Sequence, residues 1–229
     1  MFSLLFEFQP PAEQWDLYLA NEGNLRAEFG QVEGLVENIR YRSLTRDGWI
    51  LSLSGWSDEP SVGGWHNRMS NREPGERTRS KLLGDYRLRV GELTSDTRLA
   101  EGEKIVERRC DPSQASASTY VTLIDARQAP EWIHSNNPQE IALYLGFDLY
   151  SYGDCISWDV FEAVFNPGEI LLLVAWKDAQ SANDHAATQM VPDDARVRVL
   201  RVVRDHSMSR GDGAVHRRSA GQDSEDVRA

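Results

Sequence analysis

Residues 48–61 decide the fold, because a similar stretch stands 120 positions further along the chain. The first stretch reads GWILSLSGWSDEPS, and residues 168–181 read GEILLLVAWKDAQS. Seven of the 14 aligned positions are identical without a gap, whereas unrelated sequences of average composition match at about one position in sixteen. Each stretch joins an apolar strand to the start of a helix, so the pair predicts an internal duplication of the chain.

The elements around the first stretch complete one structural unit. Strands are expected at residues 1–9, 35–44, 49–56 and 81–93, and helices at 15–29 and 62–79. This strand–helix–strand–strand–helix–strand order is that of a ferredoxin-like unit, and the second copy begins with the apolar residues 120–124. The sequence thus predicts an α+β chain with a first unit at 1–93, a linker at 94–119, a second unit at 120–208 and a disordered tail at 209–229.

A duplicated unit of this kind has a simple way to bury its sheet. A four-stranded sheet with both helices on one face leaves the other face bare, and a second sheet can cover it. Two such sheets curl into a barrel with a ligand-sized interior. We therefore expect two ferredoxin-like units that form an intramolecular dimeric α+β barrel. The protein would be a pseudo-dimeric monomer, and further pairing into a homodimer stays open.

Charge and composition argue against several classes of protein. The formal net charge is −11, which disfavours a nucleic-acid partner because such proteins usually carry a basic stripe. No apolar run approaches the ~20 residues that span a bilayer, and the N-terminus does not resemble a signal peptide. We therefore expect a cytoplasmic protein without membrane contact. Cys110 and Cys155 form no zinc or disulfide pattern, and the histidines show no metal-binding spacing.

Three further motifs stand around residues 48–61. They are RYRSL at 40–44, Trp65-x-Asn67, and DYRLRV at 85–90. Together with GWILSLSGWSDE these motifs resemble the antibiotic biosynthesis monooxygenase family of dimeric α+β barrels, and the second half resembles it more weakly. The resemblance implies a barrel of two units and a small set of activities. Some relatives oxygenate aromatic polyketides with dioxygen and neither metal nor flavin, and others bind and degrade haem.

The sequence departs from the family pattern at two positions of the second helix, and the second departure argues against haem degradation. Many relatives carry a histidine on the second helix where this chain has Asn71. The haem-degrading branch shares the spacing of Trp56 and Trp65, but its iron-ligating histidine corresponds to Gly75, next to Pro74. The resemblance therefore implies an enzyme without a cofactor, with haem as the less favoured alternative.

Oxygenation without a metal requires a substrate that itself donates an electron to dioxygen, as ionised phenols and anthrones do. The site must exclude water and offer aromatic walls, a few hydrogen-bond donors and a base. The candidates for catalysis are Trp65, Asn67, Glu7 and His185, and those for substrate binding are Trp56, Tyr41, Arg68, Tyr86 and Trp176. We expect the first unit to hold the working pocket, because it keeps the family-like helix, and the second unit mainly to close the barrel.

Several of these candidates also have a structural interpretation. Trp56 recurs as Trp176, and repeated packing readily explains a repeated tryptophan. Glu7 lies out of phase with the phenylalanines around it. Inside a dry barrel its pKa would rise and it could act as a base, whereas at the barrel mouth it would be solvated. His185 replaces Trp65 in the second copy and is a base, a haem ligand or a helix-surface residue.

These residues favour a cofactor-independent monooxygenase or oxidase. Its partners would be dioxygen and a polycyclic aromatic, polyketide-type small molecule of natural-product (antibiotic) biosynthesis. Two other classes stay open. A cofactor-free cyclase, isomerase or rearrangement catalyst would act on a similar molecule without consuming oxygen. A haem-binding module would show a Soret band that depends on His185.

Overall fold

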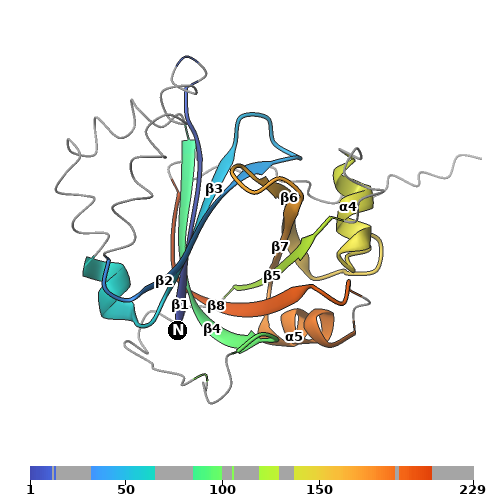
Figure 1. Ribbon diagram of the computed structural model, residues 1–229. Coiled ribbons are helices and arrows are strands. Elements are labelled where there is room, and N and C mark those ends of the chain that lie inside the picture. Colours follow the sequence, from blue (N-terminus) through green and yellow to red (C-terminus); the bar gives the residue numbers. More distant parts are fainter. Residues whose placement is uncertain are drawn as a thin grey trace, which may run out of the picture.

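The computed structural model places eight strands in one closed antiparallel barrel (Figure 1). It describes residues 1–11, 13, 32–64, 85–99, 105, 119–128, 137–188 and 191–207. The strands are β1 (Phe2–Gln9), β2 (Leu35–Ser43), β3 (Ile50–Trp56), β4 (Asp85–Asp96), β5 (Tyr120–Arg127), β6 (Cys155–Ala163), β7 (Glu169–Trp176) and β8 (Arg196–Ser207), and the helices are α4 (Pro138–Tyr144) and α5 (Ala179–Thr188). Residues 59–64 are also helical. The predicted α+β class is confirmed.

Around the barrel the strands follow the order β1-β3-β2-β6-β7-β5-β8-β4. The first half of the chain supplies four neighbouring strands and the second half the other four, so the halves meet at two junctions, β2–β6 and β4–β8. Helix α4 packs against β6, and α5 packs against β5, β7 and β8, which places both outside the barrel wall (Figure 1). None of the described helices is long and apolar enough to cross a membrane.

The observed strands agree with the expected ones, with one extension. Strand β4 continues to Asp96, beyond its expected end at residue 93. The carboxylate of Asp96 lies 2.7 Å from Nη2 of Arg196 on β8, so an ion pair across the junction holds the added residues. The helix expected at 15–29, residues 65–79 of the helix expected at 62–79, most of the linker and the tail lie outside the described residues, whereas residues 62–64 are helical as expected.

Each strand turns alternate side chains into the barrel and away from it. The inward apolar side chains of both halves form one contact cluster. Its buried members are Leu5, Tyr41, Leu51, Leu53, Leu93, Val121, Leu123, Phe161, Ala163, Leu171, Leu173, Ala175, Leu200 and Val202. The interior that we expected to hold a ligand is therefore occupied by a core that the two halves share.

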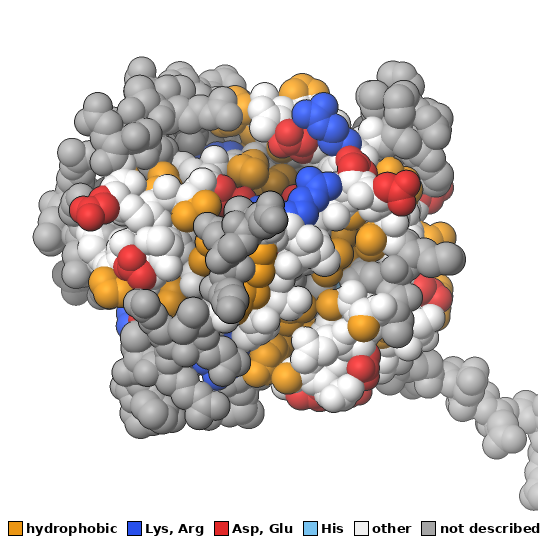
Figure 2. Space-filling model, turned by 60° about the horizontal axis from the view of Figure 1, so that its bottom comes forward, with side chains coloured by type: hydrophobic (Ala, Val, Ile, Leu, Met, Phe, Trp, Pro, Cys, Tyr) orange, Lys and Arg blue, Asp and Glu red, His pale blue; other side chains and the backbone are white. Residues whose placement is uncertain are grey.

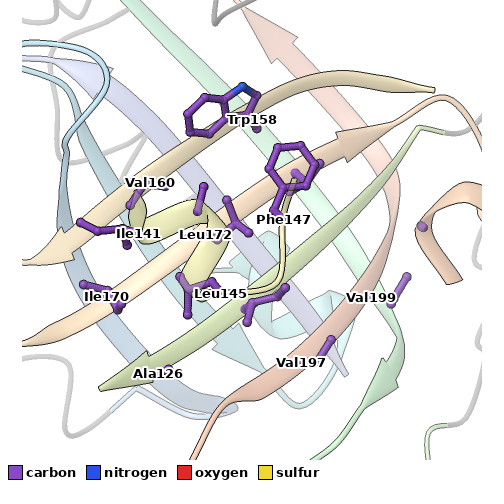
Figure 3. Close-up of a cluster of buried hydrophobic side chains, with 14 of the residues drawn as sticks. Ala126, Ile141, Leu145, Phe147, Trp158, Val160, Ile170, Leu172, Val197 and Val199 are labelled. Atoms are coloured by element: carbon purple, nitrogen blue, oxygen red, sulfur yellow. The ribbon is translucent and has the colours of Figure 1, made fainter. Parts of the chain in front are cut away.

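Two other apolar clusters lie on the outer side of the barrel wall. The larger one is covered by α4 and α5 and includes Ile141, Leu145 and Phe147 (Figure 3). In the first half, Val62 of the helical residues 59–64 packs against Trp56 and the outward side chains of β1. The wall is thus buried on both sides where helices cover it.

The strand register repeats between the two halves. Two residues, one from each half, correspond when they occupy the same position in the strand register of their half. The corresponding pairs include Phe2 and Tyr120, Glu7 and Asp125, Arg40 and Val160, Arg42 and Glu162, Ser52 and Leu172, and Glu92 and Arg201. Each position in one half therefore has a counterpart with which it can be compared.

Opposite charges meet where corresponding residues face each other. At the β2–β6 junction, Arg42 lies opposite its own counterpart Glu162, with Nη2 2.5 Å from Oε2. At the β4–β8 junction, Glu92 lies opposite its counterpart Arg201 and forms an ion pair with it. Figure 2 shows basic side chains next to acidic ones on one face of the molecule. A second copy of either half would meet like charges at both junctions.

Candidate functional site

Glu7 points into the barrel, where two arginines hold it. Its carboxylate pairs with Arg89, and its Oε2 lies 2.6 Å from Nη2 of Arg46. Arg46 follows β2 and also binds Asp159 of the second half, with Nε 2.7 Å from Oδ2. Burial alone would raise the pKa of Glu7, but the charges of Arg89 and Arg46 lower that pKa to about 2. The expected rise in pKa is therefore wrong, and Glu7 is an ion-paired carboxylate at neutral pH.

A corresponding ion pair lies at the opposite end of the barrel. Asp125 is the counterpart of Glu7, and its Oδ1 lies 2.6 Å from Nη2 of Arg198. Three antiparallel pairings separate β1 from β5 around the barrel, so these strands run in opposite directions. Tyr41 points into the shared core, where burial raises its pKa. Glu7 and Tyr41 therefore lie on the inner side of the wall.

The two repeated tryptophans lie on the outer side of the wall. Trp56 and Trp176 are each 1% exposed. Nε1 of Trp56 donates to Oγ of Ser54 at 2.9 Å, and Nε1 of Trp176 donates to Oγ1 of Thr122 at the same distance. Because both indoles are buried and hydrogen-bonded at corresponding positions, the structure favours the packing interpretation for both.

His185 lies between α5 and the sheet in the second half and is fully buried. Its ring is surrounded by Phe147, Tyr152 and Trp176, with ring centroids 4.9 to 5.6 Å away. Neither ring nitrogen makes a hydrogen bond of good geometry among the described residues, and the contact with the backbone of Gly146 is a weak one. Burial lowers its pKa to about 4, although the backbone of Gly146 acts in the opposite direction. At neutral pH His185 is an uncharged ring in a packed aromatic core, and not a helix-surface residue.

His185→Leu is expected to remove a pH-dependent loss of stability. The unfolded chain binds a proton on this ring near the ordinary pKa of 6.5, but the folded protein does so only near 4. The folded state therefore loses stability as the pH falls from 6.5 to 4, by about 2 kcal/mol at pH 5. Denaturant unfolding at pH 7 and pH 5 measures the difference. His206→Leu, at an exposed position, is the control, and an unchanged pH dependence in His185→Leu would contradict the assignment.

The outer face of the first half is divided into an apolar and a polar part. From β4 to β2, its central row consists of Leu88, Phe6, Ser52 and Arg40, and the next row of Val90, Leu4, Ser54 and Asn38. The ring of Phe6 stacks on Phe8 with centroids 4.8 Å apart and lies 6.0 Å from the ring of Tyr86. Nη1 of Arg40 donates to Oδ1 of Asn38 at 2.5 Å. Aromatic rings and hydrogen-bonding groups thus share one surface.

The same face of the second half is a packed apolar core. The corresponding central row consists of Val197, Ile124, Leu172 and Val160, all of them buried. Figure 3 labels Val197, Leu172 and Val160 within this core. Leu172 takes the place of Ser52, Val160 that of Arg40, and Trp158 that of Asn38. Of the two outer faces, the one in the first half carries the polar side chains that a ligand with oxygen substituents needs.

The structure brings together only some of the predicted residues. Tyr86 lies on the first-half face, whereas Trp65, Asn67 and Arg68 lie outside the described residues. Arg40 also lies on this face and was not among the predicted site residues, although it stands in a motif that we noted. Comparing the two copies position by position would have found it, because the second copy has an apolar residue there. Among the described residues, no group of three or more His, Cys, Asp or Glu side chains is placed to hold a metal ion.

Comparison with known proteins supplies one related sequence and a similar fold. The chain is 34% identical over 187 residues to the jasmonate monooxygenase ABM of Pyricularia oryzae strain 70-15, which covers 80% of this chain and 85% of that protein. No family model matches. An aldoxime dehydratase in complex with butyraldoxime aligns with a TM-score of 0.50 and 12% identity over 88% of this chain and 79% of that chain. An anthrone oxidase-like protein aligns with a TM-score of 0.35 and 11% identity over 90% and 92% of the two chains.

The closed barrel with helices on its outer side defines an α+β barrel protein. The sequence identity to the Pyricularia oryzae protein, which extends over most of both chains, then assigns this chain to a family within that class. The chain belongs to the antibiotic biosynthesis monooxygenase (ABM) family and is an enzyme of the ABM monooxygenase type. The resemblance predicted from its motifs is confirmed.

Proposed function

We propose that the protein is a cofactor-independent monooxygenase for a polycyclic aromatic molecule, with its pocket on the outer face of the first half. The observation that carries the proposal is the difference between the two faces. The first-half face presents Phe6, Ser52 and Arg40 where the second-half face presents buried Ile124, Leu172 and Val160. A flat molecule with oxygen substituents needs a surface of the first kind.

The proposal assigns the chain to two ferredoxin-like units, at 1–93 and 120–208. The first would bind substrate, and the second would complete the barrel. Trp65 would contribute to the aromatic wall, and Asn67 and Arg68 would donate hydrogen bonds to the substrate anion. Tyr86 would form part of the aromatic wall. The proposal also includes a natural-product role, a cytoplasmic location and a pseudo-dimeric monomer.

The chemistry proposed here balances without a cofactor. An anthrone loses both hydrogens of its methylene carbon, gains one oxygen atom as the quinone carbonyl, and releases the second oxygen atom as water. The substrate supplies all four electrons, so dioxygen is the only oxidant and no reductant is needed. The protein has to favour the substrate anion and exclude water.

A jasmonate-type substrate is the second candidate, and the name of the relative supports it. Such a molecule combines an apolar ring with a carboxylate, and Arg40 would attract that carboxylate. Hydroxylation of its saturated carbon requires two electrons from outside. Its turnover should therefore depend on an added reductant, whereas that of an anthrone should not.

Oxygen uptake with anthrone, and with jasmonate plus ascorbate, tests the proposal. With ¹⁸O₂, one labelled atom is expected in the product. Ser52→Leu copies the second-half residue and should fill the face, so turnover should fall by at least tenfold, whereas Ser52→Ala should retain it. Substrate conversion without oxygen uptake would replace the proposal with a cyclase or isomerase. A Soret band in the purified protein would replace it with a haem protein.

A further inference from the structure

We infer that Arg204, in the last strand of the second half, is a positioning residue for the monooxygenase site. It holds helical residues 59–64 on the outer side of the first half, and the predicted site residue Trp65 follows that segment directly in the sequence. The inference rests on the proposed placement of the site in the first half. It means that the working site is assembled from both halves of the chain.

The first step in the argument is the ion pair that links β8 to residues 59–64. Nη2 of Arg204 lies 2.8 Å from Oε1 of Glu59, the first of these helical residues. In the register of the barrel Arg204 lies opposite Val90, which belongs to the apolar cluster on the outer side of the first half. The pair therefore joins a strand of the second half to a helical segment of the first half.

The second step is an apolar contact beside this pair. Val203 precedes Arg204 at a bulge in β8, and its side chain packs against the same outer cluster of the first half. The corresponding bulge residue of β4 is Thr94, whose hydroxyl donates instead to the backbone carbonyl of Val199 at 3.1 Å. Two neighbouring residues of β8 thus reach the outer side of the first half, one through charge and the other through packing.

The third step is that the barrel does not require this ion pair. In the second half Ala179 stands at the position of Glu59, and Ser95 stands at that of Arg204. Neither alanine nor serine carries a charge, so the second half folds with α5 in place and without a corresponding pair.

The helix cap of the same segment shows how a purely structural contact differs. Oδ1 of Asp58 accepts the backbone N–H of Ser61 at 2.8 Å, and Oδ1 of Asp178 accepts that of Ser181 at the same distance. The cap is common to both halves, because a helix begins there in each of them. The pair made by Arg204 belongs to the half that carries the proposed site, which favours a role in that site.

Hydrogen exchange and kinetics on the full-length protein test the inference together. Arg204→Ser, which copies Ser95, is expected to speed amide exchange at residues 59–64 by about two- to fivefold, because an exposed ion pair contributes little more. Exchange at residues 179–188 should stay unchanged. With anthrone as substrate, kcat should fall by about tenfold and KM should change less than twofold, since a small misplacement costs much in rate. Swapping the charges, with Glu59→Arg and Arg204→Glu together, should reverse most of both changes.

Lys177→Ala is the matched control, because it removes an exposed ion pair of the second half, that with Asp154, and should alter neither measurement. Glu59→Ala removes the proposed anchor from its other side and takes the place of Arg204→Ser if that variant is unstable. Unchanged exchange at residues 59–64 would overturn the inference. Faster exchange with unchanged turnover would also overturn it, because the contact would then be purely structural.

The wild-type protein separates this inference from the proposed function. Oxygen consumption neither with anthrone nor with jasmonate plus ascorbate would remove the proposed function, whereas the exchange rates would still decide whether Arg204 anchors residues 59–64. Oxygen consumption that Arg204→Ser does not reduce would leave the proposed function standing and remove the positioning role.

Discussion

Glu7→Gln is expected to lower the free energy of unfolding by about 3–5 kcal/mol. Arg89 is 2% exposed, and its Nε and Nη1 have no partner among the described residues, so the carboxylate of Glu7 is its counter-charge. Removing that carboxylate leaves a buried cation unpaired. Denaturant unfolding at pH 7 measures the loss. Glu162→Gln breaks a more exposed pair with Arg42 and should cost no more than about 1 kcal/mol.

The pH dependence of the same variant provides a second measurement. The pKa of Glu7 is lowered from 4.5 to about 2 in the folded protein. Its contribution to stability is therefore complete above pH 4.5 and is lost as the pH falls toward 2. The difference between wild type and Glu7→Gln should shrink over that interval. A constant difference, or a loss below 1 kcal/mol at pH 7, would show that Arg89 has another counter-charge.

Glu92→Arg is expected to lower the free energy of unfolding by about 3–5 kcal/mol, as Glu7→Gln is. Adding Arg201→Glu should restore most of that loss. The side chain of Glu92 is 1% exposed and that of Arg201 is 15% exposed, so the single variant presses two guanidinium groups together in a largely buried junction. The double variant exchanges the charges between corresponding positions. Because the surroundings of the two positions repeat between the halves, the exchanged pair should fit.

A double-mutant cycle on unfolding free energies measures this coupling. The same exchange at Arg42 and Glu162 is the control, since that pair is more exposed and should show a smaller coupling. If Glu92→Arg combined with Arg201→Glu has no higher free energy of unfolding than Glu92→Arg alone, the opposite charges at these positions do not stabilise the contact between the two halves.

The strands of the fold could be predicted from local patterns. Alternation of apolar residues marks each of them, and Gly48 and Gly168 adopt φ values of +72° and +85° in the turns before β3 and β7, as a hairpin between two strands requires. The repeat at residues 48–61 then predicted the second half. The alternation and the turn glycines are local signals, because each determines the structure of residues next to it in the sequence.

Other features depend on contacts between distant residues and could not be predicted in the same way. A period of two shows that Glu7 and Phe6 face opposite sides, but not which side is covered by helices. The lowered pKa of Glu7 depends on Arg89, which is 82 residues away in the sequence. Of the predicted substrate-binding tyrosines, Tyr86 lies beside Phe6 on the outer face, whereas Tyr41 lies in the core inside the barrel. His185 could not be assigned to the core without α5 and Tyr152 in place.

The charges at the two junctions also have a consequence for how the halves can pair. In a symmetric dimer, a residue on the twofold axis always meets its own copy, and every substitution appears twice. A single chain with two different halves can place Arg42 against Glu162 and Glu92 against Arg201, whereas a symmetric homodimer of either half cannot. With both charge pairs in place, neither half can pair with a second copy of itself without like charges meeting at both junctions. The two halves can therefore differ, and the outer face of the second half is a packed apolar core where that of the first half carries Ser52 and Arg40.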